Sequence, residues 1–279
     1  MKNAATLLSL ATLSAACLPA GGCLLTDPFQ AKRTQTLHVA QVEHAALRVV
    51  AHNGSIQVLA EAGRKDVEVV ASIVATGDSQ AEADRRVHDI KVHCDRGVDQ
   101  LLIVRAEFPE RRRTRERASF VVRLPSVAGA KLTTSNGSIT ARSLSGQLEA
   151  SSSNGTITVD QHDGAIDVRT SNGTVSAERI TGPATIQTSN GRIDVQLDAS
   201  STGPLLARTS NGSIRATVGP HFAGRLSLRT SNGGVRFTNQ TQADVKSKLG
   251  KRDGILTFPR EGVESKLRSS NGSITVVVK

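Results

Sequence analysis

Aromatic side chains are almost absent from this sequence. The 279 residues include no Trp, no Tyr and six Phe, so aromatics make up 2% of the chain. Sites for sugars and for single-stranded nucleic acids commonly stack their ligands on aromatic rings. The scarcity argues against such a stacking site and against a core built around large rings. A core of stacked aliphatic side chains remains compatible with this composition.

Cysteine is also scarce, with three residues in the whole chain. Cys94 alone lies well inside it, in a stretch whose alternation puts Cys94 and Val92 on one strand face and His93 on the other. Because metal ligands must converge on one point, we expect no metal site here, and no other cofactor. We predict a buried free thiol at Cys94 and no disulfide framework.

The N-terminus has the composition of an export signal. One Lys, a short apolar run and several small residues precede Cys17, and the run is too short to span a bilayer. The segment Leu13–Cys17 resembles the lipobox of bacterial lipoproteins, which implies a lipid on Cys17, with Cys23 as the alternative site. We therefore expect a signal peptide over 1–16 and a tether over 17–35. The expected location is the cell envelope, as an outer-membrane or surface lipoprotein anchored in the membrane by its lipid.

A Ser-Asn-Gly tripeptide recurs through the second half of the chain. With Asp253-Gly254 counted as a further copy, successive copies are 18, 18, 18, 21, 21, 21 and 18 residues apart. Apolar residues occupy the positions four before, three after and five after each turn Asn or Asp. Such a fixed period is the signature of a repeat fold. The predicted turns are Asn136-Gly137, Asn154-Gly155, Asn172-Gly173, Asn190-Gly191, Asn211-Gly212, Asn232-Gly233 and Asn271-Gly272.

Each repeat divides into two short strands, since a second Gly turn such as Asp163-Gly164 lies midway between the Asn-Gly turns. Asn-Gly suits tight turns because both residues tolerate positive φ. One interpretation is an antiparallel meander of hairpins, and the other is a β-solenoid of stacked 18–21-residue coils. Recurrence at the whole-coil period favours the all-β solenoid over 131–279. Several turns also match glycosylation sequons, and a stack of Asn could bind a repetitive ligand, but we interpret them as structural turns.

Residues 36–130 show the same pattern with less regularity. The pair Asn53-Gly54 reproduces the repeat once, and Ser79–Glu82 is a capping box that predicts a short helix to about His88. An open solenoid end would expose strand edges and core. We therefore interpret this region as N-terminal β coils with a cap.

These features resemble the bacterial putative-adhesin family of β-strand repeat domains, whose function is unknown. The resemblance rests on the Ser-Asn-Gly-x-Ile units, on the stretch Leu47–Ile56 and on Arg123-Leu124-Pro125 just before the repeats. It implies an all-β solenoid in the cell envelope. It provides no catalytic residues to place on this chain.

The chain is basic, with 35 Lys and Arg against 25 Asp and Glu and a formal net charge of +10. Guanidinium groups bind carboxylates and phosphates through paired hydrogen bonds. A dense basic run is therefore a candidate anion-binding patch, with a solvated loop between two strands as the alternative. Long-range attraction would favour anionic glycans, whereas nothing resembles a module that reads nucleic-acid sequence. The run contains Arg111, Arg112, Arg113, Arg115 and Arg117.

No group of residues suggests catalysis. The seven His have no common spacing, and His162, next to Asp163, is expected to be solvated at a turn. We predict a non-catalytic adhesin-like or scaffolding protein that binds through its repeated Thr/Ser/Arg surface. An envelope sensor that docks another protein is the alternative. A β-helix enzyme acting on acidic polysaccharide is a further one.

Overall fold

The computed structural model describes residues 29–279 except 44, 98, 110–112 and 114. The predicted signal peptide, most of the predicted tether, and both candidate lipidation sites, Cys17 and Cys23, lie outside the described residues. The described chain forms two long β-sheets and one helix. Sheet A has the strand order β1-β4-β7-β3-β9-β11-β13-β15-β17-β23-β19, and sheet B the order β20-β21-β18-β22-β16-β14-β12-β10-β8-β2-β6-β5.

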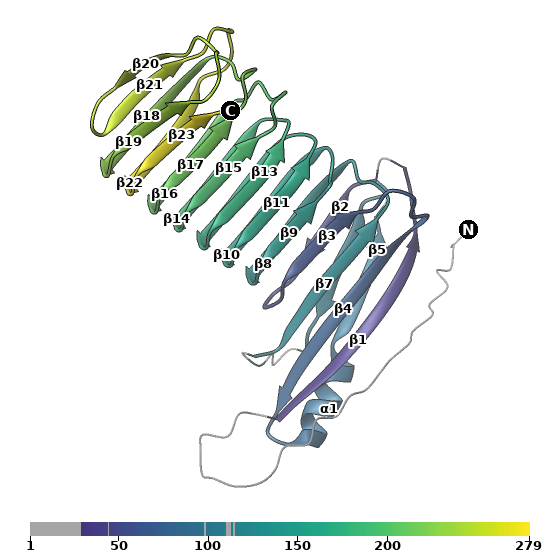
Figure 1. Cartoon of the computed structure of the whole chain (residues 1–279). Helices are drawn as coiled ribbons and strands as arrows, with labels where there is room; N and C mark the ends of the chain where they lie inside the picture. Colours follow the sequence, from purple (N-terminus) through teal and green to yellow (C-terminus); the bar gives the residue numbers. More distant parts are fainter. Residues whose placement is uncertain (1–28, 44, 98, 110–112, 114) are drawn as a thin grey trace.

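The N-terminal part combines one coil with a long antiparallel cap. Strand β1 pairs with β4 and β4 with β7, all antiparallel, and α1 packs against β1 and β4 at the end of the molecule (Figure 1). The elements are β1 (Phe29–Ala40), β2 (Leu47–Val50), β3 (Ile56–Ala60), β4 (Asp66–Gly77), α1 (Gln80–Asp89), β5 (Lys91–Arg96), β6 (Leu102–Glu107) and β7 (Arg117–Leu124).

Two boundaries can be compared with the sequence. The Ser79 cap forms as predicted: its hydroxyl accepts from the Glu82 amide at 3.2 Å, while the Glu82 carboxylate accepts from the Asp78 amide at 2.7 Å, and the helix ends at Asp89. The tether prediction over 17–35 is wrong at its C-terminal end, because residues 29–35 already pair with β4. The polar composition of that stretch concealed the strand, because only alternate residues of a strand face the core.

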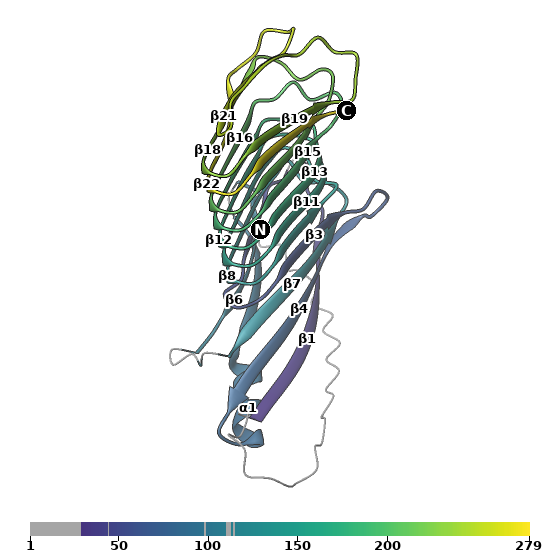
Figure 2. The same cartoon turned by 60° about the vertical axis from the view of Figure 1, so that its left-hand side comes forward.

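The repeats form a β-solenoid. Strand β10 pairs in parallel with both β8 and β12, which excludes the antiparallel meander of hairpins, and successive Asn lie in register. Figure 2 separates the strands of sheet B from those of sheet A. The strands are β8 (Gly129–Asn136), β9 (Ile139–Arg142), β10 (Gln147–Asn154), β11 (Ile157–His162), β12 (Ile166–Asn172), β13 (Val175–Ile180), β14 (Ala184–Asn190), β15 (Ile193–Leu197), β16 (Leu205–Asn211), β17 (Ile214–Val218), β18 (Arg225–Asn232), β19 (Val235–Asn239), β20 (Lys246–Leu249), β21 (Asp253–Thr257), β22 (Ser265–Asn271) and β23 (Ile274–Val278).

The core between the sheets consists of stacked aliphatic side chains. Leu148, Ile166 and Ala184 occupy one column through β10, β12 and β14, and all three are buried. Rings are few in this core: Phe120 is buried in the N-terminal part, and near the C-terminal end Phe222 and Phe258 meet edge to face with centroids 4.8 Å apart. Identical or similar residues on successive strands bury each other continuously, which explains how the chain folds with so few aromatics.

The repeat copy at Asp253-Gly254 does not form a coil, contrary to the sequence interpretation. It belongs to a hairpin in which β20 and β21 are antiparallel, and β21 is antiparallel to β18. Leu249, which the repeat columns predicted to be buried, is 43% exposed. The chain then returns, and β22 inserts between β16 and β18.

Both ends of the solenoid therefore have a coil out of sequence order. At the C-terminal end the last coil, β22–β23, lies between β16–β17 and β18–β19. At the N-terminal end the first coil, β2–β3, lies between β6–β7 and β8–β9. Each inserted coil is paired on both sides, so neither leaves a free strand edge in the stack.

Candidate functional site

A ladder of asparagine side chains runs along one edge of the solenoid. Apart from Asn53 at the N-terminal end, each Asn amide in the ladder donates to the Asn side-chain oxygen of the coil on its N-terminal side in the stack, at 2.7–2.9 Å. Each interior Asn side chain donates to one neighbouring Asn and accepts from the other, so its amide is already engaged in hydrogen bonds within the ladder. The turn interpretation therefore accounts for this edge. The ladder joins, in spatial order, Asn53, Asn136, Asn154, Asn172, Asn190, Asn211, Asn271 and Asn232.

Glycine residues, together with the hydroxyl groups of Thr and Ser, set the spacing of the coils beside this ladder. The Thr188 hydroxyl donates to the Gly173 carbonyl at 3.1 Å, and the same contact recurs in other coils. A Cβ at Gly191 would lie 1.9 Å from the Gly173 oxygen. Only glycine permits such close stacking, which keeps the edge narrow and holds the outer face of sheet B in regular rows.

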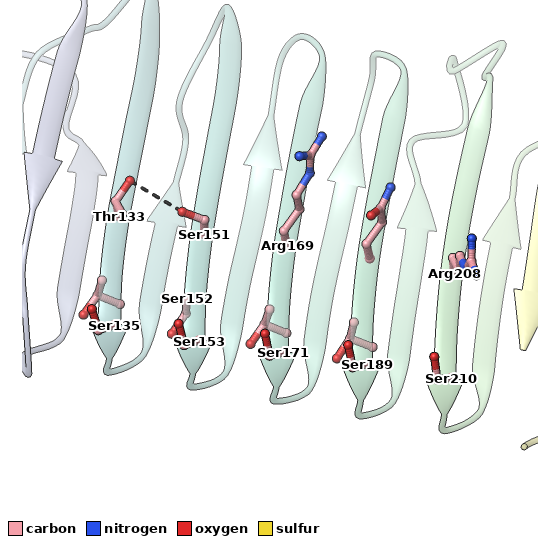
Figure 3. Close-up of a pocket in the computed structure, with 14 residues that line it drawn as sticks. Thr133, Ser135, Ser151, Ser152, Ser153, Arg169, Ser171, Ser189, Arg208 and Ser210 are labelled. Atoms are coloured by element: carbon pink, nitrogen blue, oxygen red, sulfur yellow. Dashed lines mark hydrogen bonds between the residues drawn. The ribbon is translucent and has the colours of Figure 1, made fainter. Parts of the chain in front are cut away.

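That outer face carries a shallow groove of about 550 Å³ across β8, β10, β12, β14 and β16 (Figure 3). One row of side chains along it is entirely serine. The row nearer the strand centres varies from hydroxyl to amide to guanidinium. The serine row is Ser135, Ser153, Ser171, Ser189 and Ser210, and the central row is Thr133, Ser151, Arg169, Gln187 and Arg208.

Charge on the outer face of sheet B is balanced toward its N-terminal end. The Lys131 ammonium donates to Glu149 at 2.5 Å and lowers the pKa of that carboxyl. Arg169 donates to both oxygens of Asp167, at 3.0 and 2.8 Å. Arg208 is exposed and makes no ion pair within the described part of the chain. The positive charge of the groove is therefore concentrated toward β16.

The candidate arginine patch lies elsewhere, in the connection between β6 and β7. The Arg113 guanidinium donates to both oxygens of Asp78, at 2.6 and 2.8 Å, and to Glu82 at 2.7 Å. These bonds lower the pKa of Asp78. Arg113 thus fastens this connection to the start of α1, and the patch as an anion site stays a prediction. Arg115 precedes β7 and Arg117 begins it, whereas Arg111 and Arg112 lie outside the described residues.

His162 is buried, so the expectation of a solvated imidazole is wrong. It is 2% exposed, pairs with Ile180 of the next coil, and occupies an inward position otherwise held by aliphatic residues. Its Nε2 donates to the Gly146 carbonyl at 2.9 Å. Burial lowers the pKa of His162, so the imidazole is neutral near pH 7. The residue fills the core at a coil corner.

Cys94 is a free, half-buried thiol, less buried than predicted because β5 is the edge strand of sheet B. Burial raises the pKa of Cys94 to about 11, so the thiol is protonated at neutral pH and a poor nucleophile. Among the described residues, no three His, Cys, Asp or Glu side chains gather in a way that could hold a metal ion. The helix in this part of the chain is not long and apolar enough to cross a bilayer.

Comparison with known proteins finds similarity only at the level of structure. No family model matches the chain, and no curated protein matches it. A crystal structure of a putative adhesin from Bacteroides fragilis is 12% identical, with 88% of this chain and 97% of that chain covered and a TM-score of 0.42. A putative cell adhesion protein from Clostridium sporogenes is 9% identical, with 88% and 100% covered and a TM-score of 0.34. A putative adhesin from Parabacteroides merdae is 14% identical, with 88% and 96% covered and a TM-score of 0.34.

The groove was only partly visible in the sequence. The Thr/Ser/Arg character of the outward positions was evident from the strand alternation, and the structure gathers these side chains on one face of sheet B. The specific row could have been found by aligning the residues three positions before each turn Asn, which are Thr133, Ser151, Arg169, Gln187 and Arg208. The densest run of basic residues in the sequence, Arg111–Arg117, does not belong to the strands that form this groove.

Proposed function

We propose that this chain is a non-catalytic, adhesin-like protein of the cell envelope that binds an extended polymer along the outer face of sheet B. The observation behind the proposal is the groove across five parallel strands, lined by hydroxyl and guanidinium side chains in register. Such a surface offers the same kind of contact once per coil. A ligand that repeats its own chemical groups matches that arrangement.

The shape and spacing of the groove support a polymer as the ligand. Neighbouring parallel strands lie about 4.8 Å apart, so the groove repeats its polar groups at roughly the length of one sugar unit. The groove is shallow and open, unlike the enclosed pockets that surround most small ligands. Individual exposed hydrogen bonds contribute little, but several contacts to one chain act together. We therefore favour a linear glycan over a monomer.

The described fold fits attachment through the N-terminus. Strand β1 begins at Phe29 beside α1, at the end of the molecule opposite the β20–β21 hairpin (Figure 1). We propose that a lipid on Cys17, or on Cys23 as the alternative, anchors this end in the membrane. The groove would then extend away from the anchor, available to a polymer outside the membrane. Palmitate labelling of wild type, Cys17→Ala and Cys23→Ala in cells tests this step, and label retained in both variants would contradict it.

A bulky substitution in the groove tests the binding proposal. Ser171→Trp places an indole in the middle of the serine row, and the matched control Gln196→Trp places one on the exposed outer face of sheet A. We would measure binding of the full mature protein to immobilised polygalacturonate and to a neutral galactan. We expect binding to at least one polymer, a loss of at least about tenfold for Ser171→Trp and no loss for Gln196→Trp. Absence of binding to both polymers, or equal losses in both variants, would contradict the proposal.

A further inference from the structure

Three arginines form a row across adjacent strands at the C-terminal end of sheet B. Arg208 of β16 is in register with Arg268 of β22, and Arg268 with Arg229 of β18. The strands are neighbours, so their backbones are about 4.8 Å apart. All three residues are exposed and lie on the outer face, since the residue before each is a buried aliphatic and the residue after each is a buried Thr or Ser.

The arginine row (Arg208, Arg268 and Arg229) is only partly compensated by nearby acids. Within the described residues none of the three side chains takes part in an ion pair. Two acids lie on neighbouring positions: Asp253, opposite Arg229 on β21, and Glu264, which pairs with Lys266 at 2.9 Å and whose pKa is lowered by Lys266 and, more weakly, by the charges of Arg225 and Arg268. Like charges facing each other on adjacent strands destabilise a sheet. The row thus costs stability in the free protein, and a bound anion would relieve that cost.

More positive charge surrounds the arginine row on the same face. Arg225 lies four residues before Arg229 on β18, and strand alternation puts both on the outer side. The register of β20 with β21 places Lys246 and Lys248 on this outer side as well. The field of the whole group would attract a polyanion and hold it near the row.

Each strand of the row also offers a hydroxyl on the same face. Ser210, Ser270 and Ser231 follow the three arginines by two residues, about 6.6 Å along the strand. Guanidinium groups bind carboxylates through paired hydrogen bonds, and serine hydroxyls both donate to and accept from sugar hydroxyls. A uronic acid unit presents both groups, a carboxylate and ring hydroxyls. The face lacks the aromatic rings on which nucleic-acid bases stack, which favours a glycan over a nucleic acid.

We propose that the arginine row binds the carboxylates of an acidic polysaccharide, a polyuronate, running across β16, β22 and β18 with one carboxylate per strand. This inference rests on the proposed function and names its ligand class and its principal site. The site depends on the insertion of the last coil, because without β22 no guanidinium would lie between Arg208 and Arg229. The groove over β8–β16 then receives the continuation of the same polymer.

A charge-matched pair of variants tests the arginine row. The first replaces Arg208, Arg229 and Arg268 by Gln. The control replaces three exposed arginines on the outer face of sheet A by Gln, so both lose three positive charges. The control residues are Arg142, Arg215 and Arg236.

Binding of the full mature protein would be measured at about 0.15 M salt, where long-range attraction is screened beyond about 8 Å. The probes are polygalacturonate, its methyl ester and single-stranded DNA. We expect polygalacturonate to bind at least about tenfold more tightly than its uncharged ester, and the arginine-row variant to lose at least about tenfold of that affinity. The control variant should lose less than about twofold.

The outcomes separate this inference from the proposed function. Equal binding of the acid and the ester, unaffected by the arginine-row variant, would overturn the inference while leaving a polymer-binding face. Absence of binding to every glycan probe would overturn both. Equal losses in the two triple variants would show that net charge alone matters and would overturn the site. DNA bound as tightly as polygalacturonate would overturn the ligand class. Circular dichroism and thermal unfolding of both variants verify the fold.

Discussion

Replacement of one ladder glycine by alanine should loosen the stack of coils. A Cβ at Gly155 would lie 2.0 Å from the Gly137 carbonyl oxygen, about 1 Å short of the 3.0 Å below which Cβ contacts are essentially never found. The neighbour is backbone, so no side chain can rotate away. The two coils would have to separate locally.

The separation would act on two backbone hydrogen bonds at this edge. Gly137 donates to Asn154 at 3.0 Å and Ile139 to Thr156 at 3.0 Å, and both bonds join the two coils that would separate. A displacement of about 1 Å would take such bonds beyond the usual 3.2 Å limit. The loss is about 1 kcal/mol for each bond, to which overpacking strain adds about 1–3 kcal/mol. We therefore expect Gly155→Ala to lower the free energy of unfolding by about 3–5 kcal/mol.

Gly234→Ala is the matched control. It directly follows another ladder turn, Asn232-Gly233, but a Cβ there would have no atom within 4 Å. Its effect on the free energy of unfolding should stay within about 0.5 kcal/mol. Urea unfolding of both variants, with amide exchange in β10 and β12 as a local readout, provides the comparison. If the two variants unfold at the same urea concentration as each other, close backbone stacking does not set the coil spacing and this reasoning fails.

Three further predictions concern single side chains. Asn172→Ala removes two ladder hydrogen bonds of 2.8 Å and should lower the free energy of unfolding by about 1–2 kcal/mol in urea titration. No change would mean that the exposed ladder does not contribute to the stability of the fold. Because burial lowers the pKa of His162 in the folded chain, the unfolded chain binds the proton first, and wild type should lose stability as pH falls below about 6.5. His162→Leu should remove that acid dependence of the melting temperature, and an unchanged pH profile would contradict the buried neutral imidazole. Glu116 is fully buried, and its carboxylate accepts from Arg86 at 2.7 Å. Glu116→Ala removes this carboxylate and should lower the free energy of unfolding by about 3–5 kcal/mol in thermal or urea unfolding. Asp78→Asn, at an exposed pair, is its control and should cost less than about 1 kcal/mol.

Much of the fold could be predicted because each coil repeats the same local information. The Asn-Gly turns and the apolar positions three and five residues later fix strand length, buried face and register at once. The parallel stacking of β8, β10 and β12 follows from that pattern, as does the aliphatic core. The capping box likewise determined where α1 begins, since it acts within four residues.

The order of the coils could not be predicted from the same information. Every coil carries the same apolar columns, so each coil can stack on any other. No local feature of the sequence therefore indicates that β22 lies between β16 and β18. Asp253-Gly254 matched the repeat by spacing, yet its strand pairs antiparallel in a hairpin. His162 was misjudged because one inward position of a coil corner is polar. The arginine row could not be predicted because the order of the coils could not be predicted, and Arg268 joins the row only through the inserted coil.

The most direct test of the central claim is a footprint of the arginines in the unmodified protein. Full mature protein would be treated with phenylglyoxal, with and without polygalacturonate, and the modification of each arginine would be followed by mass spectrometry. The binding face proposed for sheet B predicts that the polymer protects Arg208, Arg229 and Arg268, while Arg215 and Arg236 on sheet A react at an unchanged rate. Equal protection of both groups, or protection of the sheet A arginines alone, would contradict the account.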